Sequence, residues 1–359
     1  MLTQKYYKFV DLPELNELTD LEYNTALDIC EKIKILIAKR EAFASLDNIE
    51  NKFIELGLGW DYRRKFYNSV KYILDGDYAV INNLRLFSQQ FTGYQLISLS
   101  SSAGKIPPTN KIPDSLSELL GDKVLGDNSI NLYQSIIKKL PTEFHLGAPR
   151  YFGEIGWDIN GQLVNNDTCV YLERISLLYE AGLIYKLKEI KNPVVVEIGG
   201  GYGGLAYYIK KIIPNVQFVN VDIPESLLYA AIYLCIMFKS DIYYFFINHE
   251  SALENINNKK MLFLSDLDFD ILLEKNYHAD LVINTLSMSE MTEVQVRRYC
   301  KGIAKLIGRN GFFFEQNQNN IHCGMLNASD IINEYFVKCT PIYSSIFNLT
   351  QGAAHIWMN

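Results

Sequence analysis

The stretch Val194-Val195-Val196-Glu197-Ile198-Gly199-Gly200-Gly201-Tyr202-Gly203-Gly204 decides the fold class of this chain. A β-branched run that ends in an acid and then in glycines is typical of a buried strand followed by a tight turn and a helix. Glycine suits such a turn because a backbone without Cβ can bend sharply and let a ligand approach closely. Turns of this kind at the end of a parallel strand are where α/β folds hold nucleotides.

The glycines fit two cofactor classes, and an ordinary structural turn is a third interpretation. Gly199, Gly201 and Gly204 match G-x-G-x-x-G, the dinucleotide fingerprint. The series from Glu197 through Gly199 and Gly201 to Gly203 instead matches acid-x-G-x-G-x-G, the S-adenosylmethionine (SAM) turn of class I methyltransferases. Glu197 favours SAM, because a carboxylate beside a pyrophosphate would repel it.

A second acid lies at the end of the next predicted strand. The run 216–221 ends in Asp222, whose carboxylate could accept hydrogen bonds from both ribose hydroxyls of an adenosine moiety. This contact suits either cofactor class, so Asp222 supports nucleoside binding without choosing between them.

Composition limits the partners. The 359 residues are 48% hydrophobic and carry a net charge of −7, so a sizeable core is expected and a nucleic-acid backbone is not the expected partner. The six cysteines are scattered and form no C-x-x-C, which favours reduced thiols. The N-terminus lacks the apolar stretch of a signal peptide, and the longest apolar run, 227–238, is too short to cross a bilayer. We therefore expect a cytoplasmic protein with no membrane span.

Hydrophobic periodicity divides the chain into a mainly helical N-terminal cap domain, residues 1–143, and an α/β domain, residues 144–359. The second part opens with a Gly- and Asn-rich lead-in and a helix over 167–189, with Asp167 as its N-cap. Strand and helix then alternate, which predicts a doubly wound, mostly parallel sheet. Its strands are expected at 193–198, 216–221, 242–247, 279–284 and 311–316. Two closing β-rich runs, 341–349 and 353–358, predict a terminal hairpin and an antiparallel last strand.

Ligands of open α/β sheets bind beyond the carboxyl ends of the strands, so the residues that follow each strand are the candidate site. Ser265 and Asp266 follow the apolar run 261–264 and could contact an adenine edge, although a turn role for Asp266 is equally compatible. The polar residues after the two later strands include Asn284, Ser287, Glu290, Asn317, Asn319 and His322.

Three segments resemble class I SAM-dependent methyltransferases: EIGGGYGGLA (197–206), VDIP (221–224) and NTLSMSEM (284–291). More narrowly, they resemble the bacterial sugar O-methyltransferases of surface-polysaccharide gene clusters. The lead-in GWDINGQLVNNDTCVYLERI (156–175) is similar to that family as well. The resemblance covers residues 144–359, and the glycine motif is specific to the superfamily only.

This resemblance implies a Rossmann-like α/β catalytic domain that transfers a methyl group from SAM to a sugar hydroxyl and releases S-adenosylhomocysteine (SAH). The acceptor would be a nucleotide sugar or a glycan, and the cap would close the acceptor pocket or form a homodimer contact. The residues expected to hold the cofactor are Glu197, Gly199, Gly200, Gly201, Tyr202, Gly203, Asp222, Ile223, Ser265, Asp266 and Asn284. Those expected to contact the acceptor are His145, Ser287, Asn317 and Asn319.

A sugar hydroxyl is a poor nucleophile until its proton is removed, so a general base is expected. Glu290 and His322 are the candidates. Ordinary structural roles compete with both: a charge at a helix start for Glu290 and a loop position for His322. Replacement of each by Gln tests them.

Three alternatives remain open at this stage. The acceptor could be a peptide or another natural product, methylated on nitrogen or oxygen. The protein could be an NAD-dependent oxidoreductase, or a SAM-binding scaffold without catalysis. Asp266, Asp268 and Asp270 have the spacing of hard-cation ligands, but the glycine of a calcium loop is missing, so no metal site is predicted.

Overall fold

The computed structural model describes residues 7–45, 66–92, 112, 114–116, 128–239, 241, 243–245, 260–339 and 352–359. The chain forms two compact units, Met1–Leu27 with Lys65–Ser176 and Asp28–Arg64 with Leu177–Asn359. The division falls within helix α1 (Asp20–Ala44) and helix α7 (Asn166–Glu180). The predicted domain boundary between residues 143 and 144 stays a prediction.

The first unit contains a small sheet besides its helices. Its strands are β1 (Lys8–Val10), β2 (Gly156–Ile159) and β3 (Gln162–Val164), all antiparallel in the order β1-β2-β3. Its helices, apart from α1 and α7, are α2 (Phe66–Leu74), α3 (Tyr78–Asn82), α4 (Leu84–Phe87) and α6 (Asn128–Ile137), with short 3-10 turns η1 (Leu12–Glu14), η4 (Gln89–Thr92) and η6 (Thr142–Phe144). The described part of the N-terminal region is therefore mainly helical, as predicted, but β1 pairs with the hairpin of the lead-in.

That hairpin explains the Gly- and Asn-rich composition of the lead-in. Asn160 and Gly161 join β2 to β3 with φ of 55° and 85°, the two left-handed positions that a two-residue hairpin turn requires. A Cβ on Gly156 would lie 2.4 Å from the carbonyl oxygen of Val164, so this strand position also requires glycine.

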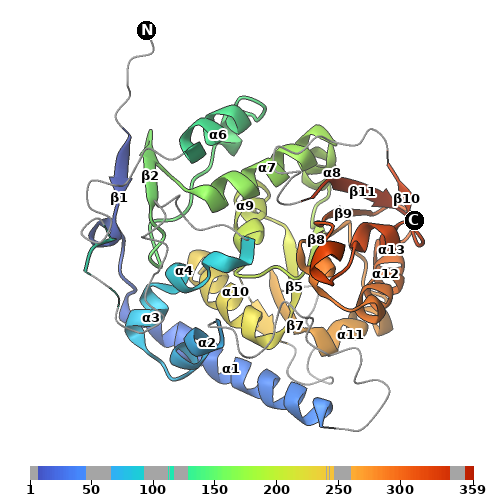
Figure 1. Cartoon of the computed structure of the whole chain (residues 1–359), viewed down its shortest axis with the longest axis horizontal. Coiled ribbons are helices and arrows are strands. Elements are labelled where there is room, and N and C mark those ends of the chain that lie inside the picture. Colours follow the sequence, from blue (N-terminus) through green and yellow to red (C-terminus); the bar gives the residue numbers. More distant parts are fainter. Residues whose placement is uncertain are drawn as a thin grey trace. The chain divides into compact units, whose positions relative to one another are not determined.

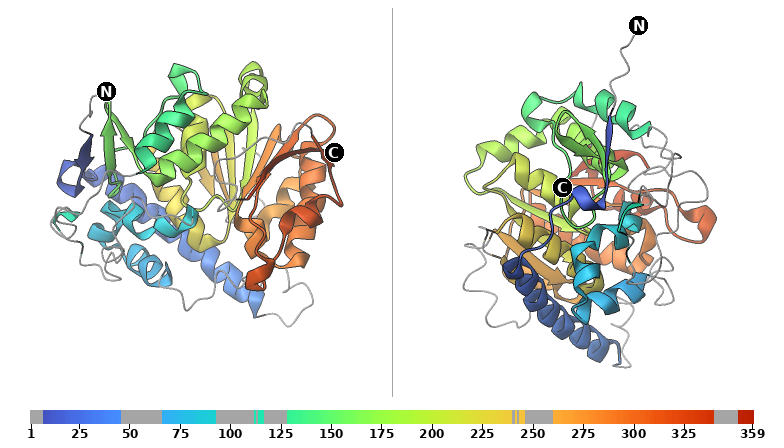
Figure 2. Two further views of the ribbon diagram at one scale, coloured as in Figure 1. Left: turned by 45° about the horizontal axis from the view of Figure 1, so that its top comes forward. Right: turned by 90° about the vertical axis from the view of Figure 1, so that its left-hand side faces the viewer.

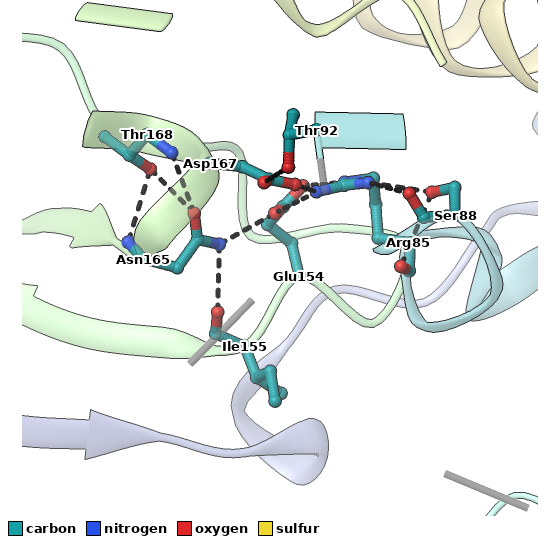
Figure 3. Close-up of polar contacts among 8 residues, drawn as sticks. All are labelled: Arg85, Ser88, Thr92, Glu154, Ile155, Asn165, Asp167 and Thr168. Carbon is teal, nitrogen blue, oxygen red and sulfur yellow. Dashed lines mark hydrogen bonds and ion pairs between the residues drawn. The ribbon is translucent and has the colours of Figure 1, made fainter. Parts of the chain in front are cut away.

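A buried polar network joins residues on either side of the hairpin in the sequence (Figure 3). The Arg85 guanidinium lies between the carboxylates of Glu154 and Asp167, with Nε–Oε2 and Nη2–Oδ2 distances of 2.7 and 2.5 Å. All three side chains are almost fully buried. Burial raises the pKa of both carboxyl groups, and the Arg85 charge opposes that rise.

This network corrects the predicted role of Asp167. Its carboxylate binds Arg85 and accepts a hydrogen bond from Thr92, so it does not cap the helix. Asn165 supplies the cap instead, because its Oδ1 accepts from the backbone N–H of Thr168 at 2.9 Å. The single helix expected over 167–189 is also two helices, α7 and α8 (Leu183–Glu189), separated by Gly182 with φ of 74°.

The second unit is built on an eight-stranded sheet in the order β10-β11-β9-β8-β4-β5-β7-β6 (Figure 1). The strands are β4 (Val194–Ile198), β5 (Gln217–Asp222), β6 (Tyr243–Phe245), β7 (Met261–Ser265), β8 (Leu281–Thr285), β9 (Phe312–Gln316), β10 (Val337–Lys338) and β11 (Ala354–Met358). Neighbouring strands are parallel except that β11 is antiparallel to β9 and β10, which confirms the antiparallel last strand. The run 341–349 lies outside the described residues.

Helices cover both faces of this sheet (Figure 2). α9 (Gly204–Ile212) and α10 (Pro224–Met237) pack together, and α10 lies against β5 and β7. α11 (Phe269–Glu274), α12 (Glu293–Ile307) and α13 (Ala328–Ile332) form the other layer, with α12 against β8 and β9. This layer buries alternate strand residues such as Val196 and Ile198, as the two-residue period of a strand requires. β7 is a strand absent from the sequence prediction, and it separates β5 from β6.

The described helices include none that is both long and apolar enough to span a bilayer. All six cysteines are free thiols, and four of them are buried.

Candidate active site

The glycine turn after β4 has the conformation that its sequence predicts. Gly199, Gly201 and Gly203 have φ of 73°, 58° and 85°, in the left-handed region that favours glycine. A Cβ on Gly199 would lie 1.9 Å from the Ser287 hydroxyl oxygen, and one on Gly203 would lie 2.9 Å from the Leu234 side chain. A side chain would therefore not fit at position 199 or at position 203. The backbone of the turn lies at the edge of the sheet.

Glu197 lies beneath this turn. Its side chain is 1% exposed, and a Cβ on Gly200 would lie 2.9 Å from its Oε2 atom. A pyrophosphate bound on the turn would lie close to the buried Glu197 carboxylate. Repulsion between these two negative groups would be strong, because the dielectric constant of a buried site is low. The site thus fits a cofactor that is cationic or neutral at this point better than one with two phosphates.

Asp222 at the end of β5 is tied to the turn. Its Oδ2 accepts from the backbone N–H of Gly201 at 3.0 Å, and its Oδ1 accepts from the N–H of Ile223 at 2.8 Å. Burial raises the pKa of Asp222 to about 7, and these two backbone donors limit the rise. Each carboxylate oxygen can accept a further hydrogen bond, so the group suits two ribose hydroxyls.

Tyr202 is also in the turn, but its ring points into the core. It is 2% exposed and packs edge-on against Tyr233, with ring centroids 5.3 Å apart. A cofactor contact from Tyr202 would therefore come from its backbone. Ile223 is the N-cap residue of α10, and Pro224 is the first residue of that helix.

The end of β7 places Ser265 beside Asp222 in the sheet, since the two residues pair in register. The Ser265 hydroxyl caps a 3-10 turn, η8 (Asp266–Asp268), by accepting from the N–H of Leu267. The buried carboxylate of Asp266 pairs with Arg40, 3.2 Å from its Nε atom. Burial raises the pKa of Asp266, and the Arg40 charge opposes that rise.

Arg40 is a site residue that the sequence analysis missed. It lies on α1, 226 residues before its partner, and no local pattern marks it. The same charge opposes the raised pKa of Glu225 at the start of α10. One buried cation thus compensates acids that follow β5 and β7.

Each of the three spaced acids at 266–270 pairs with a different basic side chain. Asp268 accepts from Lys39 at 2.5 Å, and Asp270 accepts from Arg298 at 2.7 Å. Among the described residues, no group of three or more potential ligands is placed to hold a metal ion.

After β8, an amide and a hydroxyl hold the turn from its other side. Asn284 donates through Nδ2 to the carbonyl oxygen of Ile198 at 2.8 Å and to the Ser287 hydroxyl at 2.6 Å. Leu286 between them has φ of 67°, a strained conformation for a leucine. Glu290 ends the 3-10 turn η9 (Ser287–Glu290) and is half-buried. Asn284 is fully buried, so in this structure it positions the turn.

The residues that follow β9 lie at the same edge of the sheet. Asn317 is buried and donates through Nδ2 to Asn284 at 3.0 Å. Asn319 is exposed, and its Oδ1 accepts from the N–H of Ile321. His322 is exposed on the 3-10 turn η10 (Ile321–Cys323). All three residues line a cavity of about 700 Å³.

His145 belongs to the first unit. Its Nε2 atom lies 3.1 Å from the carbonyl oxygen of Leu140, a contact that holds the ring locally. Its predicted role at the acceptor stays a prediction.

Comparison with known proteins gave similarity in structure only. No family model matches the chain, and no curated protein matches it in sequence. A candidate O-methyltransferase from Nostoc punctiforme aligns over 54% of this chain and 59% of its own, at 12% identity and a TM-score of 0.33. An O-methyltransferase family protein from Burkholderia thailandensis aligns over the same shares, at 9% identity and a TM-score of 0.33. Coclaurine N-methyltransferase, solved with N-methylheliamine and SAH, aligns over 41% of this chain and 36% of its own, at 16% identity and a TM-score of 0.25.

The chain thus spans less than two thirds of the length of these three structures. Because identities and TM-scores are this low, we base the functional assignment on the site itself.

Proposed function

We propose that this protein is a SAM-dependent O-methyltransferase whose acceptor is a sugar hydroxyl. One observation carries the cofactor assignment: a glycine-rich turn lies over the buried Glu197 and is hydrogen-bonded to Asp222. A buried acid under the turn disfavours a dinucleotide, and an acid at the next strand end suits a ribose.

The residues of the turn would hold SAM by shape and charge. Gly199, Gly201 and Gly203 supply a backbone without side chains, Asp222 would accept from the ribose hydroxyls, and Glu197 would orient the turn toward the cationic methionine end. Bound SAM would supply an electrophilic methyl group on a positively charged sulfur. Methyl transfer is an in-line displacement, so alignment of the acceptor oxygen supplies much of the rate.

A base would take the hydroxyl proton as the oxygen attacks. Both candidates follow strands at the carboxyl edge, and His322 lines the polar cavity described above. This position makes His322 the favoured base and leaves Glu290 as the second candidate. Loss of a general base typically lowers turnover by about 10²- to 10⁴-fold.

The sugar acceptor rests on the resemblance of the segments 156–175 and 284–291, together with the amide-rich edge of the sheet. Incubation with SAM labelled in the methyl group, against panels of glycosides, nucleotide sugars, amines and peptides, tests this assignment. We expect methylation of sugar hydroxyls alone. Transfer to amines or peptides only would replace the sugar by another acceptor, and SAH binding without any transfer would indicate a scaffold.

Base variants separate the two candidates within the same assay. We expect His322→Gln to lose turnover and Glu290→Gln to keep most of it, with SAH affinity unchanged in both. His278→Gln is the matched control, since His278 is exposed and lies before β8, at the opposite end of that strand. Full turnover in both variants would reject a base at either position.

A further inference from the structure

The cavity beyond β9 has a wall that the sequence analysis did not identify. His355 on β11 lies opposite Glu315 on β9 in register, and its Nδ1 atom is 2.7 Å from Glu315 Oε1. Glu315 is fully buried, whereas His355 is 9% exposed and lines the cavity. Since Nδ1–H donates to the carboxylate, the neutral ring carries its lone pair on Nε2.

Three donors converge on Glu315 and fix it. Besides His355, the Ser329 hydroxyl donates to Oε1 at 2.9 Å and the Asn317 amide donates to Oε2 at 2.9 Å. A carboxylate held this way orients its histidine rigidly, because a change of tautomer or rotamer would break a charge-assisted hydrogen bond. The imidazole is thus a preorganised polar group in the cavity wall.

A continuous hydrogen-bond chain joins this wall to the glycine turn. It runs from the carbonyl oxygen of Ile198 to Asn284, from there to Asn317, then to Glu315 and finally to His355. All members but His355 are 4% exposed or less. Adjacent strands lie about 4.8 Å apart, so His355 on the third strand from β4 lies about 14 Å from the turn. That separation suits recognition of a group beyond the reacting hydroxyl.

The remaining lining is polar and nearly balanced in charge. Lys338 and Asp330 contribute opposite charges, and the Lys338 ammonium lies 5.3 Å from the centroid of the Trp357 ring. The buried Glu315 adds a negative charge behind the wall, which disfavours a phosphate. Asn327 precedes α13, but its side chain makes no capping hydrogen bond, so its amide can serve a ligand.

We propose that this cavity binds a neutral, polyhydroxylated part of the methyl acceptor, with His355 and Asn327 as its recognition groups. An amide can both donate and accept, as vicinal hydroxyl groups do, and the Nε2 atom of His355 can accept a hydrogen bond from one of those hydroxyls. The volume lies within the range of about 300–1,000 Å³ that is usual for small-molecule sites. This inference rests on the proposed function, and it selects a glycoside or glycan acceptor over a nucleotide sugar.

The test is titration of the full chain with methyl glycosides of common hexoses and 6-deoxyhexoses, and with the matching nucleotide sugars, each with and without SAH. We expect saturable binding of a neutral glycoside and no tighter binding of its nucleotide form. His355→Gln and Asn327→Ala should each weaken that binding about 10- to 100-fold, the range for loss of one or two strong hydrogen bonds. In turnover assays, KM should rise by a similar factor with little change in kcat.

Two controls guard the interpretation. SAH affinity should stay unchanged in both variants, which shows that they fold, and His278→Gln should bind the glycoside like the wild type. Unchanged glycoside affinity in both variants would overturn the inference, as would tenfold tighter binding of a nucleotide sugar or no glycoside binding at all. Failure of the wild type to bind SAH would instead refute the proposed function. In that case the titrations without SAH would still show whether the cavity binds a glycoside.

Discussion

The pKa of Asp222 gives a prediction that links burial, charge and cofactor affinity. Its carboxyl titrates near pH 7 in the free protein because burial disfavours the charged form. Two ribose hydroxyls would donate to the charged form, so SAH should bind the ionised protein more tightly and lower this pKa on binding. Linkage then requires SAH affinity to rise with pH until Asp222 is ionised.

The magnitude follows from that value. With a pKa of about 7, roughly a tenth of the free protein is ionised at pH 6 and most of it at pH 8. SAH affinity should therefore increase about tenfold between these pH values, provided that the pKa in the complex lies below 6. Asp222→Asn removes the titrating group and weakens two charge-assisted hydrogen bonds of about 1.5–3 kcal/mol each, a loss of more than tenfold in affinity at pH 8.

Isothermal titration with SAH at pH 6, 7 and 8 measures both effects. The wild type should show the rise, and Asp222→Asn should bind weakly with a flat pH dependence, which also controls for titration of SAH itself. A flat profile in the wild type, or equal affinity of the variant at pH 8, would refute the reasoning about Asp222.

Three further predictions concern stability, each measured as the free energy of unfolding in urea. Gly199→Ala places a Cβ at a positive φ and in close contact with Ser287, and should cost about 2–4 kcal/mol. Gly324→Ala is the control, because Gly324 has a similar φ but open space around it, and should cost about 1 kcal/mol. Equal losses in the two variants would contradict a crowded glycine turn. Arg40→Met leaves a buried carboxylate unpaired and should cost about 3–5 kcal/mol. Arg85→Met should cost at least as much, since it strands two carboxylates, while Arg297→Met, at a half-exposed ion pair, should cost much less than either; losses no larger than that control would show that neither buried pair matters.

Local patterns predicted the parts of this structure that local physics determines. The strand ahead of the glycines and the helix after Pro224 follow from β-branched runs and from the fixed φ of proline. The closing antiparallel strand was predictable because the last two β-rich runs have no crossover helix between them. β7 was missed because its short apolar run has no period that distinguishes a strand from a buried helix.

Contacts between distant residues could not be predicted. Asp167 has the position of a helix cap, but a buried arginine 82 residues earlier takes its carboxylate. Arg40 and Asp266 meet across 226 residues, and the Glu315–His355 pair depends on strand register. None of these leaves a periodic or local signal, since the sequence shows a charge but not its partner.

The most direct measurement of the central claim is the crystal structure of the protein in complex with SAH. We expect the ribose hydroxyls on the Asp222 carboxylate and the amino-acid end of SAH over the turn from Gly199 to Gly203. SAH bound elsewhere, or a dinucleotide with its pyrophosphate seated on that turn above Glu197, would contradict the central claim.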